Sequence, residues 1–219
     1  MDRGKEEGRS ETTRRRLMEA AEAAFAEKGL SGARVDEIAA AAAINKRMIY
    51  EYFGSKELLY KQVLFQVYRR LETAERNLIE HQLSGITLIR SLISMYFDFL
   101  RDNDTFVSIL MWENLNRGQC LREMPEDSFQ RPTLHFFMKE IQRGKEEGIF
   151  REDLDTEQLV VSLITVCFAN FSNRYTLSEL FGLPLDQPAM MEKRKAHTID
   201  LILTYICPEG RNYRKEHFE

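Results

Sequence analysis

The sequence is poor in the residues that mark disulfide-rich, membrane-spanning and β-rich proteins. It has three cysteines, five prolines and one tryptophan in 219 residues. Cys120, Cys167 and Cys207 are odd in number and widely spaced, so neither a disulfide framework nor a metal site is indicated. The longest apolar run, residues 159–169, is far shorter than the roughly 20 residues of a membrane-spanning helix, and residues 1–10 contain no apolar signal region. We therefore expect a cytoplasmic protein with no membrane partner.

What is present favours helices. Leu, Glu, Lys, Arg and Ala dominate long stretches, and no appreciable stretch alternates between apolar and polar residues, so the predicted class is all-α. Periodicity and turn formers predict helices over 11–28, 35–43, from the Asn45 cap to Gly54, for some 25 residues from Ser55, and over 86–102, 104–116, 127–147, 155–180 and 189–206.

Residues 35–53 have the spacing of a helix-turn-helix. Small Ala39 stands where the two helices would cross, Ile44 follows the turn, and Ile49 faces inward on the second helix. The second helix would then present an outward face to the major groove of DNA. That face consists of Lys46, Arg47, Met48, Tyr50 and Glu51.

Together with its flanks, this stretch resembles the N-terminal signature of the TetR family of transcriptional regulators. The matching segments are FAEKGLSGARVDEIAAAAAIN, IYEYF and GSKELL, between about Leu17 and Leu64. The resemblance implies a three-helix DNA-binding head joined by a long fourth helix to a larger helical body. We accordingly expect a flexible arm over 1–10, a helix-turn-helix DNA-binding domain over 11–60, and an effector-binding and dimerisation domain over 61–219.

The resemblance also implies partners. We expect a homodimer that binds double-stranded operator DNA, and a small-molecule effector that releases this repressor from a pseudo-palindromic site. No cofactor is expected. The expected DNA-binding residues are Arg34, Asn45, Lys46, Arg47, Met48, Tyr50, Glu51, Tyr52 and Lys56.

Two of these residues have distinct expected roles. Lys56 lies in the first turn of the fourth helix, where free backbone N–H groups and the helix dipole favour a phosphate. Arg47 can pair bidentately with guanine and is our candidate for the chief base reader; a non-specific phosphate contact is the alternative. The hydroxyls of Tyr50 and Tyr52 can reach phosphates.

Three positions depart from the family pattern. Ala43 stands where the family has a turn glycine, and a left-handed alanine there would cost about 1 kcal/mol. Arg34 replaces a threonine that starts the second helix, which forfeits a cap. Glu51 would repel phosphate unless it accepts from a cytosine or pairs with a neighbouring cation.

Aromatic and methionine residues are dense in the middle of the chain. We expect some of them to line a cavity for an apolar or aromatic effector, although ordinary core is the alternative for any single one. The candidates are Phe97, Phe106, Met111, Trp112, Phe136, Phe137, Asn170 and Arg174. Asn170, Asn173 and Arg174 either reach this cavity or form hydrogen bonds across a dimer interface.

The helices at 155–180 and 189–206 are apolar on more than one side. Such helices must be buried on two sides, so we predict that they form a four-helix dimer interface; central helices of a monomer are the alternative. The expected interface residues are Val160, Ile164, Phe168, Phe171, Tyr175, Ile202 and Ile206.

An enzymatic function is not expected. A metal-binding carboxylate bundle would need a Glu three residues before a His on each of two helices. The residues three positions before the four histidines are instead Leu78, Pro132, Arg194 and Arg214. A Gly-rich phosphate loop and a nucleophile elbow are also missing. The other alternative is an interaction scaffold with a vestigial helix-turn-helix.

Charge alone does not mark the head as a DNA-binding domain. Residues 1–60 contain 11 Lys and Arg against 11 Asp and Glu, so the net charge of −4 lies in the rest of the chain. A head that binds DNA must therefore separate its charges in space.

Overall fold

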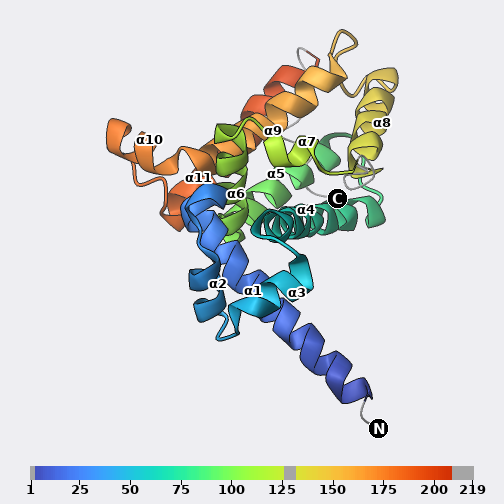
Figure 1. Cartoon of the computed structure of the whole chain (residues 1–219). Helices are drawn as coiled ribbons and strands as arrows, with labels where there is room; N and C mark the ends of the chain where they lie inside the picture. Colours follow the sequence, from blue (N-terminus) through green and yellow to red (C-terminus); the bar gives the residue numbers. More distant parts are fainter. Residues whose placement is uncertain (1–2, 126–131, 209–219) are drawn as a thin grey trace. The chain divides into compact units, whose positions relative to one another are not determined.

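The computed structural model describes residues 3–125 and 132–208. Every regular element among these residues is a helix, which confirms the all-α class (Figure 1). The helices are α1 (Arg3–Gly32), α2 (Val35–Ala41), α3 (Lys46–Phe53), α4 (Lys56–Glu80), α5 (Gly85–Asp102), α6 (Asp104–Leu115), α7 (Gln119–Arg122), α8 (Pro132–Glu146), α9 (Thr156–Ser172), α10 (Arg174–Phe181) and α11 (Pro188–Ile206).

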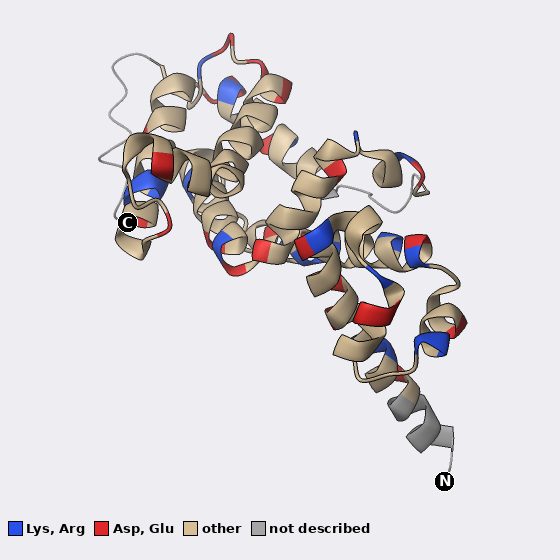
Figure 2. Ribbon diagram, turned by 60° about the vertical axis from the view of Figure 1, so that its left-hand side comes forward, with Lys and Arg blue, Asp and Glu red and all other residues tan. Residues whose placement is uncertain are grey.

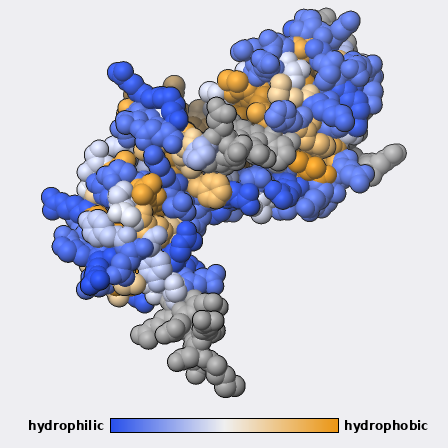
Figure 3. Space-filling view, turned by 45° about the vertical axis from the view of Figure 1, so that its right-hand side comes forward, coloured by the Kyte–Doolittle hydropathy of each residue, from blue (hydrophilic) through white to orange (hydrophobic). Residues whose placement is uncertain are grey.

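The chain forms two compact units. Unit 1 comprises Met1–Arg70 and Asp104–Phe129, and unit 2 comprises Leu71–Asn103 and Gln130–Glu219. The long helix α4 is continuous through Arg70, where one unit passes into the other. Hydrophilic residues cover most of each unit on the face shown in Figure 3, with apolar patches between them.

Unit 1 is built around α1. One face of this helix lies in the core of the unit, because Leu17, Ala21 and Phe25 are fully buried. The Phe25 ring meets the ring of Tyr60 edge-on, with centroids 5.0 Å apart, and thereby ties α1 to α4. Aromatic packing of this kind fixes the start of α4 on the three-helix head.

The units divide the chain differently from the predicted boundary at residue 60. Helix α6 belongs to unit 1 because it packs against α1. The hydroxyl of Thr105 and the guanidinium of Arg70 both donate to Glu22, a carboxylate that is 8% exposed. A buried carboxylate needs such partners, and here they join α1, α4 and α6.

The predicted flexible arm over 1–10 stays a prediction, and from Arg3 onward, where helix α1 begins, its backbone is helical. Arg, Lys and Glu are good helix formers, and in this segment they outweigh two glycines.

Unit 2 has α5 at its centre, packed by α8, α9 and α11. The Phe97 ring on α5 meets the Phe171 ring on α9 edge-on, at a centroid distance of 5.6 Å. Of the helix predicted over 127–147, the structure shows Pro132–Glu146, and residues 127–131 lie outside the described residues.

The helix predicted over 155–180 is two helices. Helix α9 ends at Ser172 and α10 begins at Arg174, with Asn173 between them at φ −108° and ψ 7°. The Asn173 side chain donates to the Ala169 carbonyl and to the Ser172 hydroxyl. Asparagine competes in this way with the helix backbone, and apolar periodicity does not reveal the break.

Candidate nucleic-acid interface

The turn between α2 and α3 is a Schellman motif with an alanine in the left-handed position. The Ala43 N–H donates to the Ala40 carbonyl and the Ile44 N–H donates to the Ala39 carbonyl, both at 3.0 Å. Ala43 has φ 51°, the conformation that glycine adopts more easily. The Arg16 guanidinium donates to the carbonyl of Ala42 at 2.5 Å and supports this turn from α1.

Helix α3 is set at a fixed angle by its cap and its buried face. The Asn45 side chain accepts from the backbone N–H of Arg47 at 2.9 Å, which confirms the predicted cap. Ile49 is fully buried and Phe53 is 7% exposed. The opposite face, with Lys46, Arg47, Tyr50 and Glu51, is exposed.

The two cations of α3 are each paired with a carboxylate. The Lys46 ammonium lies 3.0 Å from a carboxylate oxygen of Asp36 on α2, and this hydrogen bond raises the pKa of Lys46. The Arg47 Nε donates to Glu51 one turn later at 2.8 Å. Glu51 therefore pairs with a neighbouring cation, one of the two options open from sequence. The Asp36 partner was not foreseen. Figure 2 shows both signs of charge on the helices of unit 1.

The start of α4 supports the phosphate role expected of Lys56. The Ser55 hydroxyl accepts from the Leu58 N–H at 3.1 Å and caps the helix. Lys56 is partly exposed and donates one hydrogen bond to the Ala33 carbonyl at 3.1 Å, near the end of α1. An ammonium group has three donors, so this bond holds the side chain in place and leaves donors for an anion.

Two further candidates lie on α3 and at the start of α2. The Tyr52 hydroxyl lies 3.0 Å from the Ser10 hydroxyl, which links α3 to α1. Arg34 is exposed at the N-cap of α2 and, as a pure donor, cannot accept from the helix N–H groups. In the first turn of α2, the hydrogen bond from the Lys28 ammonium is the main cause that lowers the pKa of Glu37.

Two family models match this chain. Residues 17–63 match the model described as bacterial regulatory proteins of the tetR family, and residues 86–202 match the tetracyclin repressor-like C-terminal domain. The second match alone covers more than half of the chain. The protein belongs to the TetR family. It is thus a helix-turn-helix, DNA-binding transcriptional regulator, and the segment from α2 to the start of α4 is its candidate DNA surface.

Relatives and solved structures agree with this assignment. The chain is 30% identical to the transcriptional repressor NicS of Pseudomonas putida over 177 residues, 80% of this chain and 84% of NicS. It is 27% identical to the repressor KstR2 of Mycobacterium tuberculosis over 154 residues, 68% of this chain and 75% of that protein. The solved structure of KstR2 superimposes with a TM-score of 0.67 at 23% identity, covering 90% of this chain and 95% of that one, and supports the fold.

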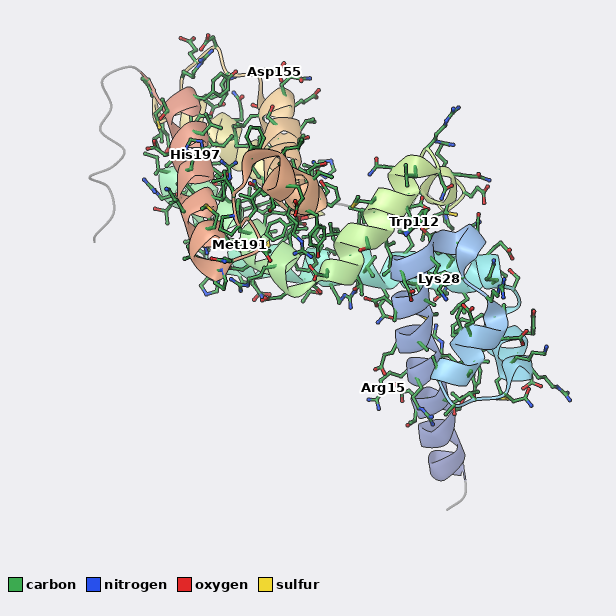
Figure 4. All side chains as sticks on the ribbon, turned by 90° about the vertical axis from the view of Figure 1, so that its left-hand side faces the viewer. Arg15, Lys28, Trp112, Asp155, Met191 and His197 are labelled. Atoms are coloured by element: carbon green, nitrogen blue, oxygen red, sulfur yellow. The ribbon has the colours of Figure 1, made fainter. Side chains whose placement is uncertain are left out.

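The effector candidates of this TetR-family regulator fall in both units. In unit 1, Phe106 is buried against Tyr68, Met111 is 41% exposed, and Trp112 packs on α1. The Trp112 indole N–H donates to the Ala26 carbonyl at 3.2 Å, and Figure 4 shows this side chain on α6 close to α1. This packing accounts for Trp112 without an effector.

The other effector candidates lie in unit 2. Phe97 and Phe137 are buried, and the neighbouring rings of Phe136 and Phe137 have centroids 5.7 Å apart. Asn170 accepts from the Arg194 guanidinium of α11 at 2.9 Å, so its amide holds α9 to α11. Arg174 stacks over the ring of Tyr175 with 4.7 Å between the guanidinium carbon and the ring centroid.

The expected interface residues divide between core and surface. Phe171, Ile202 and Ile206 are at most 5% exposed inside unit 2, so they are not available to a partner. The prediction is wrong at these three positions, because a helix that is apolar nearly all round does not reveal which stripe faces inward. Val160 and Phe168 are half-buried, and Ile164 and Tyr175 are exposed. Val161, Leu201 and Tyr205, which are not among the expected interface residues, are also exposed.

Among residues 3–125 and 132–208, no three His, Cys, Asp or Glu side chains are grouped to hold a metal ion. Within the same residues, no helix combines the length and the apolar character needed to cross a bilayer.

Proposed function

We propose that this protein represses transcription as a homodimer and that a small apolar or aromatic molecule releases it from a pseudo-palindromic operator. The observation that carries the proposal is the outward face of α3, with Lys46 and Arg47 exposed and the opposite side buried on α1 and α2. NicS and KstR2 are both named repressors. Since an operator is chromosomal DNA, we place the protein in the cytoplasm.

The geometry of this surface supports a proposed role for each residue. Arg47 stands one position inside α3, where a guanidinium can pair with guanine O6 and N7, and Glu51 one turn later holds it along the helix. Lys56, Tyr50, Tyr52 and Arg34 would contact phosphates and fix the register of α3 in the groove. Lys46, Met48 and the cap residue Asn45 complete the surface.

Dimerisation is proposed through the outward faces of α9 and α11. Val161 and Ile164 on α9 and Leu201 and Tyr205 on α11 are between 39% and 59% exposed. A two-fold axis through these faces would form a four-helix interface. Two heads held at about 34 Å would then meet successive major grooves on one side of the duplex.

The effector is proposed to act by population shift. KstR2 is described as a ketosteroid regulator, which favours an apolar ligand here as well. Phe97, Phe136 and Phe137 are the aromatic candidates of unit 2, with Asn170 and Arg174 as polar ones, while Phe106, Met111 and Trp112 lie in unit 1. The proposed effector binds more tightly to a dimer whose heads have the wrong separation than to one with the right separation. Its difference in affinity for these two conformations sets how far the affinity for DNA falls.

A mobility-shift titration tests the proposal. Purified protein is mixed with the DNA flanking its gene, with random DNA of equal length as competitor. Specific retention that weakens steeply with salt supports the regulator. Absence of retention at low salt would overturn it. Arg47→Ala should change which site is preferred, and an equal loss on specific and random DNA would refute its role as base reader.

The same assay, repeated with apolar and aromatic small molecules, tests the effector. Release of DNA by one compound and not by its close analogues supports a specific site. Transcript levels from the flanking genes should rise when this gene is deleted, and a fall would show activation in place of repression.

A further inference from the structure

Exposed apolar side chains in unit 2 gather on three successive elements. In the described part of this unit, the large apolar residues that remain exposed come from α9, from α10 with its following loop, and from α11. The most exposed are Leu180 at 77%, Phe181 at 68% and Tyr175 at 66%, and Leu183 in the loop after α10 is 43% exposed. Such a concentration on a folded protein marks a contact surface.

The segment 174–187, which we call the α10 arm, is a formed element. It starts one residue after α9 and ends where α11 begins, and Figure 1 shows α10 standing apart from the other helices of unit 2. Ser178 accepts twice from the returning loop, at its carbonyl from the Leu183 N–H (3.1 Å) and at its hydroxyl from the Leu185 N–H (3.2 Å). Gly182, at φ 62° and ψ 32°, allows this return.

The arm buries little of its apolar surface against its own subunit. Every residue of α10 keeps part of its side chain exposed, and α10 packs mainly against α9. A helix of eight residues is too short to be stable alone in water, so its apolar side chains need a further partner.

Position and charge both favour a second copy of this chain as that partner. The arm continues directly from α9, whose outward residues Val161 and Ile164 form the proposed dimer face. Its charged residues are Arg174, Glu179 and Asp186, a net negative set. Anionic lipid surfaces and DNA both require clusters of Lys and Arg, which the arm does not have.

We propose that the α10 arm of each subunit docks onto the second subunit through Leu180 and Phe181 and extends the interface formed by α9 and α11. The inference rests on the proposed homodimer. It adds an exchanged contact in which each chain covers the arm of the other.

Sedimentation of the full chain tests the arm. Leu180→Glu combined with Phe181→Glu should raise the dimer dissociation constant at least about 10-fold, because two charges would enter an apolar contact. At protein concentrations low enough for the chain to be monomeric, the helical circular dichroism signal and the melting temperature should not change, since both side chains are exposed in the single chain. Leu115→Glu is the matched control: Leu115 is a leucine of α6 that is 72% exposed, and its substitution should leave the constant unchanged.

A second variant locates the contact. A benzoylphenylalanine at position 181, irradiated in a mixture of ¹⁴N- and ¹⁵N-labelled chains, should give cross-linked peptides that pair the two labels. Cross-links only within one chain would overturn the arm contact, as would an unchanged dissociation constant for the double variant. Binding of wild type to phosphatidylglycerol vesicles that the double variant loses would also overturn it.

Two results distinguish a failure of the arm inference from a failure of the proposed function. If wild type is dimeric and binds its operator but the arm variant dimerises equally well, only the arm inference fails. If wild type sediments as a monomer at micromolar concentration, the homodimer and the arm fail together.

Discussion

Arg47 and Glu51, one helical turn apart on the exposed face of α3, form an ion pair with 2.8 Å between the guanidinium Nε and a carboxylate oxygen. The Arg47 side chain is 83% exposed and that of Glu51 is 46% exposed. An exposed pair of this kind contributes little to stability. We therefore propose that Glu51 restricts the position of the Arg47 side chain. On random DNA the guanidinium then contacts phosphates less readily.

Glu51→Gln should strengthen binding to random DNA by about 3- to 10-fold at low salt and steepen the salt dependence by about one ion, because Arg47 is released and a repulsive carboxylate is removed. Fluorescence anisotropy across a salt series measures both quantities. Glu19→Gln is the control, since Glu19 also lies one turn from an arginine, with 3.8 Å between the Arg15 Nε and a carboxylate oxygen of Glu19. Figure 4 shows Arg15 on the side of α1 away from α2 and α3. Equal effects of the two substitutions would show that the change in net charge alone, and not the release of Arg47, strengthens binding.

Lys56→Ala should weaken binding to specific and random DNA alike and lower the salt slope by about one, because a phosphate contact carries no sequence information. Lys61→Ala serves as control: Lys61 also lies on α4 but pairs with Glu123 at 2.9 Å. A loss confined to the specific site would show that Lys56 acts on bases, contrary to its proposed role.

The parts of this fold that sequence could predict are those set by local pattern. The Asn45 cap and the inward Ile49 each depend on residues within one turn, and both are as expected. The sequence leaves open whether Ala43 is left-handed, and the structure has it at φ 51°. The choice of inward stripe on α9 and α11 depends on which distant helix packs there, so Phe171 and Ile202 were misassigned.

Long-range contacts also decided what Trp112 and Asp36 do. Trp112 packs against α1 some 80 residues earlier, and nothing near it in sequence indicates that contact. Asp36 reads as an ordinary first-turn acid of α2, and only the folded turn brings it to Lys46. Asp36 and Glu51 therefore lie among the cations of the candidate DNA surface, and the expected separation of charges is not seen at these two pairs.

Ala43→Gly should stabilise the protein by about 1 kcal/mol, because glycine adopts φ 51° without the strain of a Cβ atom. Urea unfolding followed by circular dichroism gives the free energy. Ala40→Gly, at an exposed position inside α2, should destabilise by about 0.5–1 kcal/mol. If both substitutions destabilise, the left-handed alanine is not strained.

Gly29→Ala should destabilise by at least about 2 kcal/mol more than Gly148→Ala. Both glycines have positive φ, 65° and 69°, but a Cβ at Gly29 would lie 2.7 Å from the Trp112 ring, whereas at Gly148 it meets nothing within 4 Å. Because Trp112 is the sole tryptophan, its emission should shift to the red only in the first variant. Equal losses of stability would mean that the indole moves aside freely.

Cys167 should make stability fall at alkaline pH. Its thiol is fully buried in α9, and burial raises its pKa from 9.0 to about 12. Because the folded pKa exceeds the unfolded one, the neutral thiol contributes stability that is complete below about pH 9 and is lost as pH rises toward 12. The loss from this group is about 1 kcal/mol by about pH 10.

Cys167→Ala lowers stability at neutral pH by leaving a small cavity, but above pH 9 its unfolding free energy should fall less with pH than that of wild type, by this amount. Parallel curves would show that the buried thiol does not govern the alkaline loss.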